Sequence, residues 1–218
     1  MITYEEIKNN KNIRTYIQKA DESLIALGYT EHSFAHVTKV AEMSGYILSA
    51  LGYGEREVEL VKIAGFLHDI GNLLNRAEHS QSGAVMAFRI LDKLGMEAED
   101  IADIVTAIGN HDEGTGVPVN AIAAALFLAD KSDVRRTRVR CDEKDFDIHD
   151  RVNYSVTSSD LAITEDKKEI ILTITIDTAL SSVTDYFEIF LERMLLCKKA
   201  AERLGIKFGL VINGQTLM

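Results

Sequence analysis

The sequence predicts a mainly α-helical fold that carries a small β-β-α-β appendage at its C-terminal end. From residue 3 to about residue 140, apolar residues recur mostly at spacings of three and four, the period of helices that bury one face. The only proline is Pro118, so few residues interrupt such helices. After about residue 141, β-branched residues become frequent and one segment alternates with a period of two, which is typical of strands.

In the first part of the chain, the apolar spacing predicts seven helices, near residues 3–10, 11–28, 34–51, 55–68, 80–95, 97–110 and 119–137. Several of these segments are followed by a glycine, a residue that readily ends a helix. Gly52 and Gly95 are examples, and Gly71 is interpreted in the same way.

In the second part, residues 152–164 and 168–178 are predicted to be strands, and TEDKK between them is suited to a hairpin turn. Residues 183–205 form a long amphipathic pattern, and residues 206–214 are a final short strand. We therefore expect two domains, a helical domain at residues 1–145 and a β-β-α-β subdomain at residues 146–218.

Composition narrows the class of protein. The 218 residues are 46% hydrophobic and 27% charged, which is ordinary for a globular protein. We expect no membrane span, because no stretch of about 18 uninterrupted apolar residues occurs. The start of the chain lacks the order of a signal peptide, and Cys141 and Cys197 form no metal-type pair, so a cytoplasmic protein with reduced thiols is expected. A net charge of −10 argues against binding long nucleic acids, whose phosphate backbones an acidic protein repels.

Four histidines and two aspartates stand at or near the ends of predicted helices with apolar neighbours: His36, His68, Asp69, His79, His111 and Asp130. A lone histidine in such a place is more often an ordinary core or surface residue. An unpaired carboxylate in the apolar helix AIAAALFLAD would, however, cost several kcal/mol, so Asp130 needs a partner. Helix ends can converge on one pocket in a bundle, and imidazole with carboxylate suits Fe, Mn, Zn, Co or Ni.

The order of these motifs resembles the HD superfamily of metal-dependent phosphohydrolases. The resemblance rests on His36 at the start of a helix, His68-Asp69 in FLHDIGN and Asp130 in FLADKSD, and it covers roughly residues 25–140. It implies an HD-type helical bundle. Because His79 and His111 lie between the HD pair and the last aspartate, the chain is similar to the binuclear members of the superfamily.

The resemblance implies two divalent transition metals in each chain. The first would be held by His36, His68, Asp69 and Asp130, and the second by Asp69, His79 and His111. Asp69 would bridge the two metals and is therefore the residue on which catalysis depends. The implied reaction is hydrolysis of a phosphate ester or anhydride in a small molecule, with a nucleotide favoured, by a metal-activated water.

Substrate-binding residues are expected beside the last ligand. Lys131, Arg135 and Arg136 are the candidates, because arginine can bind phosphate through two parallel hydrogen bonds and residues 131 and 135 would share a helix face. Surface charge that balances the acidic segment 141–150 explains the same run equally well. Asn72 is a further candidate, and it stands where many family members have a lysine after HDxG.

Alternatives therefore stay open. Some HD relatives with the same ligand arrangement are di-iron oxygenases, and a non-enzymatic sensor or binding module with a structural metal is a third interpretation. No G-Y-P element follows, so cyclic-di-GMP is not assigned as the substrate. His32 could line the pocket, whereas His149 is interpreted as incidental. The apolar face of residues 183–205 would pack on its own strands or form a homodimer.

Overall fold

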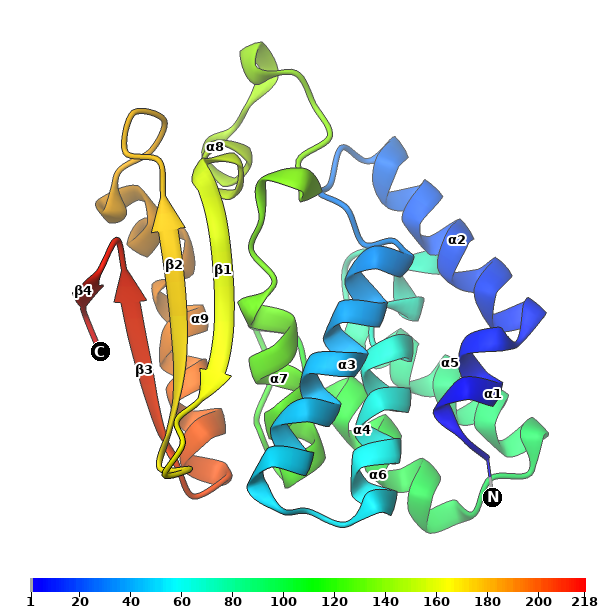
Figure 1. Ribbon diagram of the computed structural model, residues 1–218. Coiled ribbons are helices and arrows are strands. Elements are labelled where there is room, and N and C mark those ends of the chain that lie inside the picture. The colour runs from blue at the N-terminus through cyan, green and yellow to red at the C-terminus, as the bar shows by residue number, and fades with distance from the viewer. Residues whose placement is uncertain (1) are drawn as a thin grey trace.

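The computed structural model, which describes residues 2–218, places a helical bundle beside a small C-terminal sheet (Figure 1). This confirms the predicted mainly helical fold with a C-terminal appendage. The helices are α1 (Tyr4–Asn9), α2 (Lys11–Ala26), α3 (Phe34–Leu51), α4 (Glu55–Leu67), α5 (His79–Leu94), α6 (Ala98–Gly109), α7 (Ala121–Ser132), α8 (Ile148–Ser155) and α9 (Val183–Arg203). Short 3₁₀ turns cover Ile70–Leu73, Arg136–Arg138 and Glu143–Asp145.

Four strands form one sheet in the order β1-β2-β3-β4: β1 (Val156–Ile163), β2 (Glu169–Ile176), β3 (Lys207–Ile212) and β4 (Gln215–Thr216). The hairpin strands β1 and β2 are antiparallel. β3 runs parallel to β2, because α9 connects the two strands and returns the chain to the end of the sheet at which β2 begins. In Figure 1, α9 lies behind the sheet, and it contacts α7 as well as β2 and β3.

Helix α7 lies at the centre of the molecule. Every residue from Ile122 to Ser132 is buried, because α3, α4 and α6 contact α7 on one side and α9 and β1 contact it on the other. This burial explains why the sequence AIAAALFLAD is apolar on all faces. One continuous apolar core, from Tyr4 in α1 to Ile212 in β3, therefore runs through both predicted domains.

Two predicted elements were wrong in their bounds. The helix predicted over 119–137 ends at Ser132, because Asp133 has φ −82° and ψ 65° and leaves the helical conformation. Residues 152–155 were predicted to be strand, but they are the last turn of α8, and the strand begins at Val156. The two-residue strand β4 was not predicted at all.

No helix in residues 2–218 is long and apolar enough to cross a membrane. The division at residue 145 stays a prediction.

Candidate metal centre

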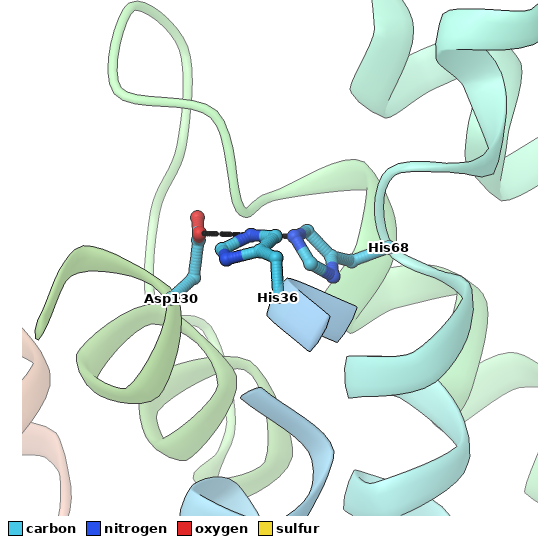
Figure 2. Close-up of side chains that lie close together, drawn as sticks. All are labelled: His36, His68 and Asp130. Carbon is cyan, nitrogen blue, oxygen red and sulfur yellow. Dashed lines mark ion pairs between the residues drawn. The ribbon is translucent and has the colours of Figure 1, made fainter. Parts of the chain in front are cut away.

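The six predicted ligands come from five different elements and meet at one end of the bundle. His36 lies in the first turn of α3, and His68 caps the end of α4, followed by Asp69. His79 begins α5, His111 follows α6, and Asp130 lies near the end of α7. All six side chains are buried. Figure 2 shows three of them, His36, His68 and Asp130, pointing toward one another.

One half of the centre lies between α3, α4 and α7. Nε2 of His36 is 3.3 Å from Oδ1 of Asp130 and 3.6 Å from Oδ2 of Asp69. Nε2 of His68 is 3.2 Å from Oδ2 of Asp69 and 3.7 Å from Oδ1 of Asp130. Atoms that share one metal at about 2.0–2.2 Å stand roughly 3–4 Å apart, so this spacing suits a common ion.

The other half of the centre uses the second oxygen of Asp69. Nε2 of His79 is 3.5 Å and Nε2 of His111 is 3.9 Å from Oδ1 of Asp69, and the two Nε2 atoms are 3.1 Å apart. The Asp69 carboxylate thus turns Oδ2 toward one pair of histidines and Oδ1 toward the other pair. This is the orientation that a bridging ligand needs.

The tautomer of each histidine follows from its other ring nitrogen. Nδ1 of His68 lies 2.7 Å from the Gly65 carbonyl, and Nδ1 of His111 lies 2.6 Å from the Ile108 carbonyl. His79 repeats this arrangement, with Nδ1 3.1 Å from the Arg76 carbonyl. A carbonyl oxygen can only accept, so Nδ1 carries the proton and Nε2 keeps a free lone pair.

His36 reaches the same state through a carboxylate that the sequence analysis missed. Its Nδ1 is 2.8 Å from Oδ2 of Asp133, which is completely inaccessible to solvent. The salt bridges of Lys39 and Arg135 to Oδ1 keep Asp133 ionised, each at 2.8 Å. No signal in the sequence indicated this role, because it depends on α7 ending at Ser132 rather than at residue 137 as predicted.

The electrostatics favour charged carboxylates and, at His79 and His111, neutral imidazoles. At His68, burial acts to lower the pKa, but Asp69 and Asp130 outweigh burial and raise it. Burial acts to raise the pKa of Asp69, but His68 and its neighbouring histidines outweigh burial and hold the pKa well below its ordinary range. Asp130 is similar: burial opposes ionisation, and Lys131, whose Nζ is 2.7 Å from Oδ2, prevails. Burial lowers the pKa of His111 well below its ordinary value. Ionised carboxylates and neutral imidazoles are the forms in which these residue types bind metal.

Gly71 has a different role from the one expected. It does not end a helix but lies within the 3₁₀ turn after Asp69. A Cβ at this position would stand 2.0 Å from the carbonyl oxygen of His79 and 2.5 Å from the amide nitrogen of Gly83. Gly71 therefore allows the start of α5, with its ligand His79, to approach the HD segment.

A pocket of about 380 Å³ opens over the centre, and it is lined by Asp69, His79, His111 and Asp130. Of the predicted substrate-binding residues, only Lys131 lines it. His32 does so as anticipated, and His149 does so although it was interpreted as incidental. Three arginines that were not predicted to bind substrate also line the pocket: Arg76, Arg138 and Arg193.

The other predicted substrate-binding residues are occupied elsewhere. Arg135 lies past the end of α7 and is paired with Glu31 and Asp133. Arg136 donates to the carbonyl of Tyr154 at 2.7 Å and packs on its ring. Asn72 is buried, and its amide donates to Oδ1 of Asp69 at 2.9 Å, so it orients the bridging carboxylate rather than facing the pocket.

The donor set fits a divalent metal. Nε2 of His36 and Nε2 of His68 are buried and find no hydrogen-bond partner among residues 2–218. A buried polar atom without a partner is costly, and a metal ion removes that cost. Two groups of potential ligand atoms each lie within 4.8 Å of one another, one made of His36, His68 and Asp130 and the other of His68, Asp69 and His111.

The chain is similar to several known proteins. Residues 33–137 match the family model of the HD domain. The chain is 26% identical over 211 residues to an uncharacterised protein of Methanocaldococcus jannaschii, covering 85% of this chain and 79% of that one. It is 30% identical over 115 residues to Ribonuclease Y of Aliarcobacter butzleri, covering 51% of this chain and 20% of the ribonuclease.

The chain thus spans about a fifth of the length of that ribonuclease. A crystal structure from an uncultured Thermotogales bacterium, described as a predicted HD superfamily hydrolase, is 22% identical with a TM-score of 0.44. The alignment covers 62% of this chain and 75% of the other.

Proposed function

Because this chain belongs to the HD domain family through its residues 33–137, we propose that it is a metal-dependent hydrolase of a phosphate ester or anhydride in a small molecule, such as a nucleotide. One observation carries the proposal. Four buried histidines each direct Nδ1 toward a carbonyl or carboxylate oxygen and leave Nε2 facing two buried aspartates. A hydrogen-bonded core would not need four free lone pairs at one point.

Two divalent ions, when bound, would neutralise phosphoryl charge and lower the pKa of a water molecule that attacks phosphorus. His36, His68 and Asp130 would hold one ion, His79 and His111 the other, and Asp69 both. The chain itself orients these ligands: Asn72 fixes Oδ1 of Asp69, and Lys131 holds Oδ2 of Asp130. Such outer contacts typically change metal affinity or activity about 10–100-fold.

The pocket supports a small, anionic substrate. Its volume of about 380 Å³ is in the range of small-molecule sites. Six acidic and four basic side chains line it, so the protein lining alone carries a formal excess of two negative charges. Two divalent cations would reverse that sign. A phosphorylated ligand would therefore bind to the metal-loaded protein and be repelled by the metal-free protein.

An RNA phosphodiester is a second candidate substrate, and the similarity to Ribonuclease Y over 51% of this chain favours it. Two features favour the small molecule instead. The protein has a net charge of −10, and the acidic residues Asp147 and Asp150 also line the pocket. Both features would disfavour a long polyanion.

The test is metal analysis of protein purified without added metal or chelator, followed by phosphate-release assays on the same sample. The panel contains nucleotides and a short single-stranded RNA, whose cleavage is followed by the length of the fragments because a cut phosphodiester releases no inorganic phosphate. We expect close to two metals per chain and release of phosphate from a nucleotide. If the protein cleaves RNA and leaves the nucleotides intact, the RNA phosphodiester becomes the proposed substrate. Two irons without any hydrolysis would favour the oxygenase, and no metal uptake from Fe, Mn, Zn, Co or Ni would leave only a binding module.

The bridging role of Asp69 gives a sharper test. Asp69→Ala removes a ligand from both metal positions, so we expect the metal content to fall by at least one ion per chain and hydrolysis to fall at least about 100-fold. Asp142→Ala is the control, because Asp142 is exposed and does not line the pocket. Full metal content and full activity in Asp69→Ala would reject the bridging assignment.

A further inference from the structure

The C-terminal helix α9 contributes a cation to the pocket. Arg193 lines the pocket, although it lies in the predicted C-terminal subdomain, more than sixty residues after the last predicted ligand. Its side chain is only 19% exposed. Cζ of its guanidinium lies 4.0 Å from the centre of the Phe190 ring, which also lines the pocket. This cation–π contact helps to hold the guanidinium in place.

Arg193 shares one carboxylate with a second cation. Nε and Nη2 of Arg193 lie 2.8 and 2.7 Å from Oε1 of Glu113, and Nζ of Lys131 lies 3.5 Å from the same oxygen. Glu113 belongs to the loop that follows the ligand His111. The other partner of Lys131 is Asp130, at 2.7 Å. If Asp130 gives its charge to a metal, one carboxylate is left for two cations.

Arg193 also keeps donor capacity. Its two contacts with Glu113 use Nε and Nη2, and within residues 2–218 no protein acceptor is found for Nη1. Arginine binds phosphate through parallel N–H groups in a fixed fork, and it keeps its charge at every physiological pH. Asn72, the neutral candidate near the HD pair, is engaged with Asp69 instead.

We propose that Arg193 of α9 and Lys131 of α7 form an anion subsite, which binds phosphate oxygens of the substrate beside the metal centre. The C-terminal segment is therefore part of the active site and not a separate appendage. This inference rests on the proposed function, because it requires that a phosphorylated ligand enters the pocket.

A purely structural role for Arg193 makes a different prediction. In that case Arg193 would hold Glu113 and so anchor the loop, in which His111 lies two residues before Glu113, without binding the substrate. Loss of an anchor would lower the metal content and leave phosphate affinity per metal-loaded chain unchanged. Loss of an anion subsite would leave the metal content unchanged and weaken phosphate binding.

The experiment is calorimetric binding of inorganic phosphate to the full-length, metal-loaded protein, with metal content measured on each sample. Arg193→Gln removes the charge, and Arg203→Gln removes an exposed arginine from the same helix as a matched control. We expect wild type and Arg203→Gln to bind alike, and Arg193→Gln to bind about tenfold more weakly, as for the loss of one charge-assisted hydrogen bond. In turnover with an active substrate, KM should rise more than kcat falls.

The outcomes separate the two claims. Wild-type protein that holds metal but binds no phosphate overturns both the proposed function and this inference. Wild-type binding with equal affinity in Arg193→Gln overturns the subsite alone. If Arg193→Gln loses its metal, Arg193→Lys decides: intact metal with weaker phosphate binding supports the subsite. Lost metal or unchanged phosphate binding in Arg193→Lys assigns Arg193 to the loop and overturns it.

Discussion

At the residue scale, the centre depends on a local arrangement that occurs three times. His68, His79 and His111 each direct Nδ1 toward the carbonyl oxygen three residues earlier in the chain. Because the carbonyl and the ring belong to the same turn, the backbone itself selects the tautomer and the direction of Nε2. No distant residue is needed for this, so these three ligands are determined locally.

His36 is the exception, because a residue 97 positions away fixes it. Nδ1 of His36 is 2.8 Å from Oδ2 of Asp133. Asp133→Asn keeps the shape but removes the charge that favours a protonated Nδ1, so we expect metal affinity to fall about 10–100-fold. Metal competition with a chromogenic chelator measures the loss. Asp142→Asn, at an exposed aspartate, should bind metal like the wild type; equal affinity in both variants would show that Asp133 does not tune the site.

The sequence predicts the six candidate ligands because they stand at or near the ends of predicted helices and because their order resembles the HD superfamily. For Asp130, the apolar helix around it also demands a partner. The predicted ligands do converge in the structure. Arg193 and Asp133 could not be predicted in the same way. Their roles depend on how α9 packs on α7 and on where α7 ends, and neither follows from local spacing.

At the element scale, the position of His68 relative to His36 depends on how closely α3 and α4 pack. Gly65 makes this approach close: a Cβ there would stand 2.8 Å from Cα and 2.9 Å from the amide nitrogen of Ala41. Backbone atoms cannot move aside as a flexible side chain can. The two helices would have to separate, and the His36–His68 spacing would change with them.

Gly65→Ala is therefore expected to destabilise the fold by about 1–3 kcal/mol through overpacking. Gly109→Ala is the matched control in helix α6, where the added Cβ would meet Cβ of Ala84 at an ordinary 3.6 Å. The control should be neutral or up to about 1 kcal/mol more stable, since alanine favours helix over glycine. Urea unfolding of both metal-free variants measures the difference. A neutral Gly65→Ala would mean that the helices yield easily.

Element types were predicted more reliably than element ends. Apolar periodicity identifies α2 through α7, because each buries one face or, in α7, all faces. The segment 152–155 misled the prediction, since its residues VNYS continue directly into a β-branched strand, and the hydrogen-bonded turn of α8 leaves no mark in composition. Strand β4, with only two residues, is too short to produce a pattern.

At the scale of the whole molecule, the predicted boundary at residue 145 crosses a continuous core. Helix α7 is apolar on all sides because α9 completes its burial, and Phe190 and Met194 of α9 belong to the same buried cluster as Ile63 and Phe127. A helix that presents apolar surface on every side cannot remain folded in water with one side open. The two parts should therefore unfold together.

Met194→Ala tests this cooperativity. Met194 is completely buried in α9, so its truncation leaves a cavity that costs about 2–5 kcal/mol, whereas Leu195→Ala, at a neighbour that is 46% exposed, should cost little. If the chain is one cooperative unit, calorimetry of Met194→Ala shows a single transition at a lower temperature. Saturating metal raises that transition, because metal binds only the folded centre, whose six candidate ligands all lie before α9 in the chain. Two transitions, of which only the metal-independent one responds to Met194→Ala, would instead establish two domains that fold separately.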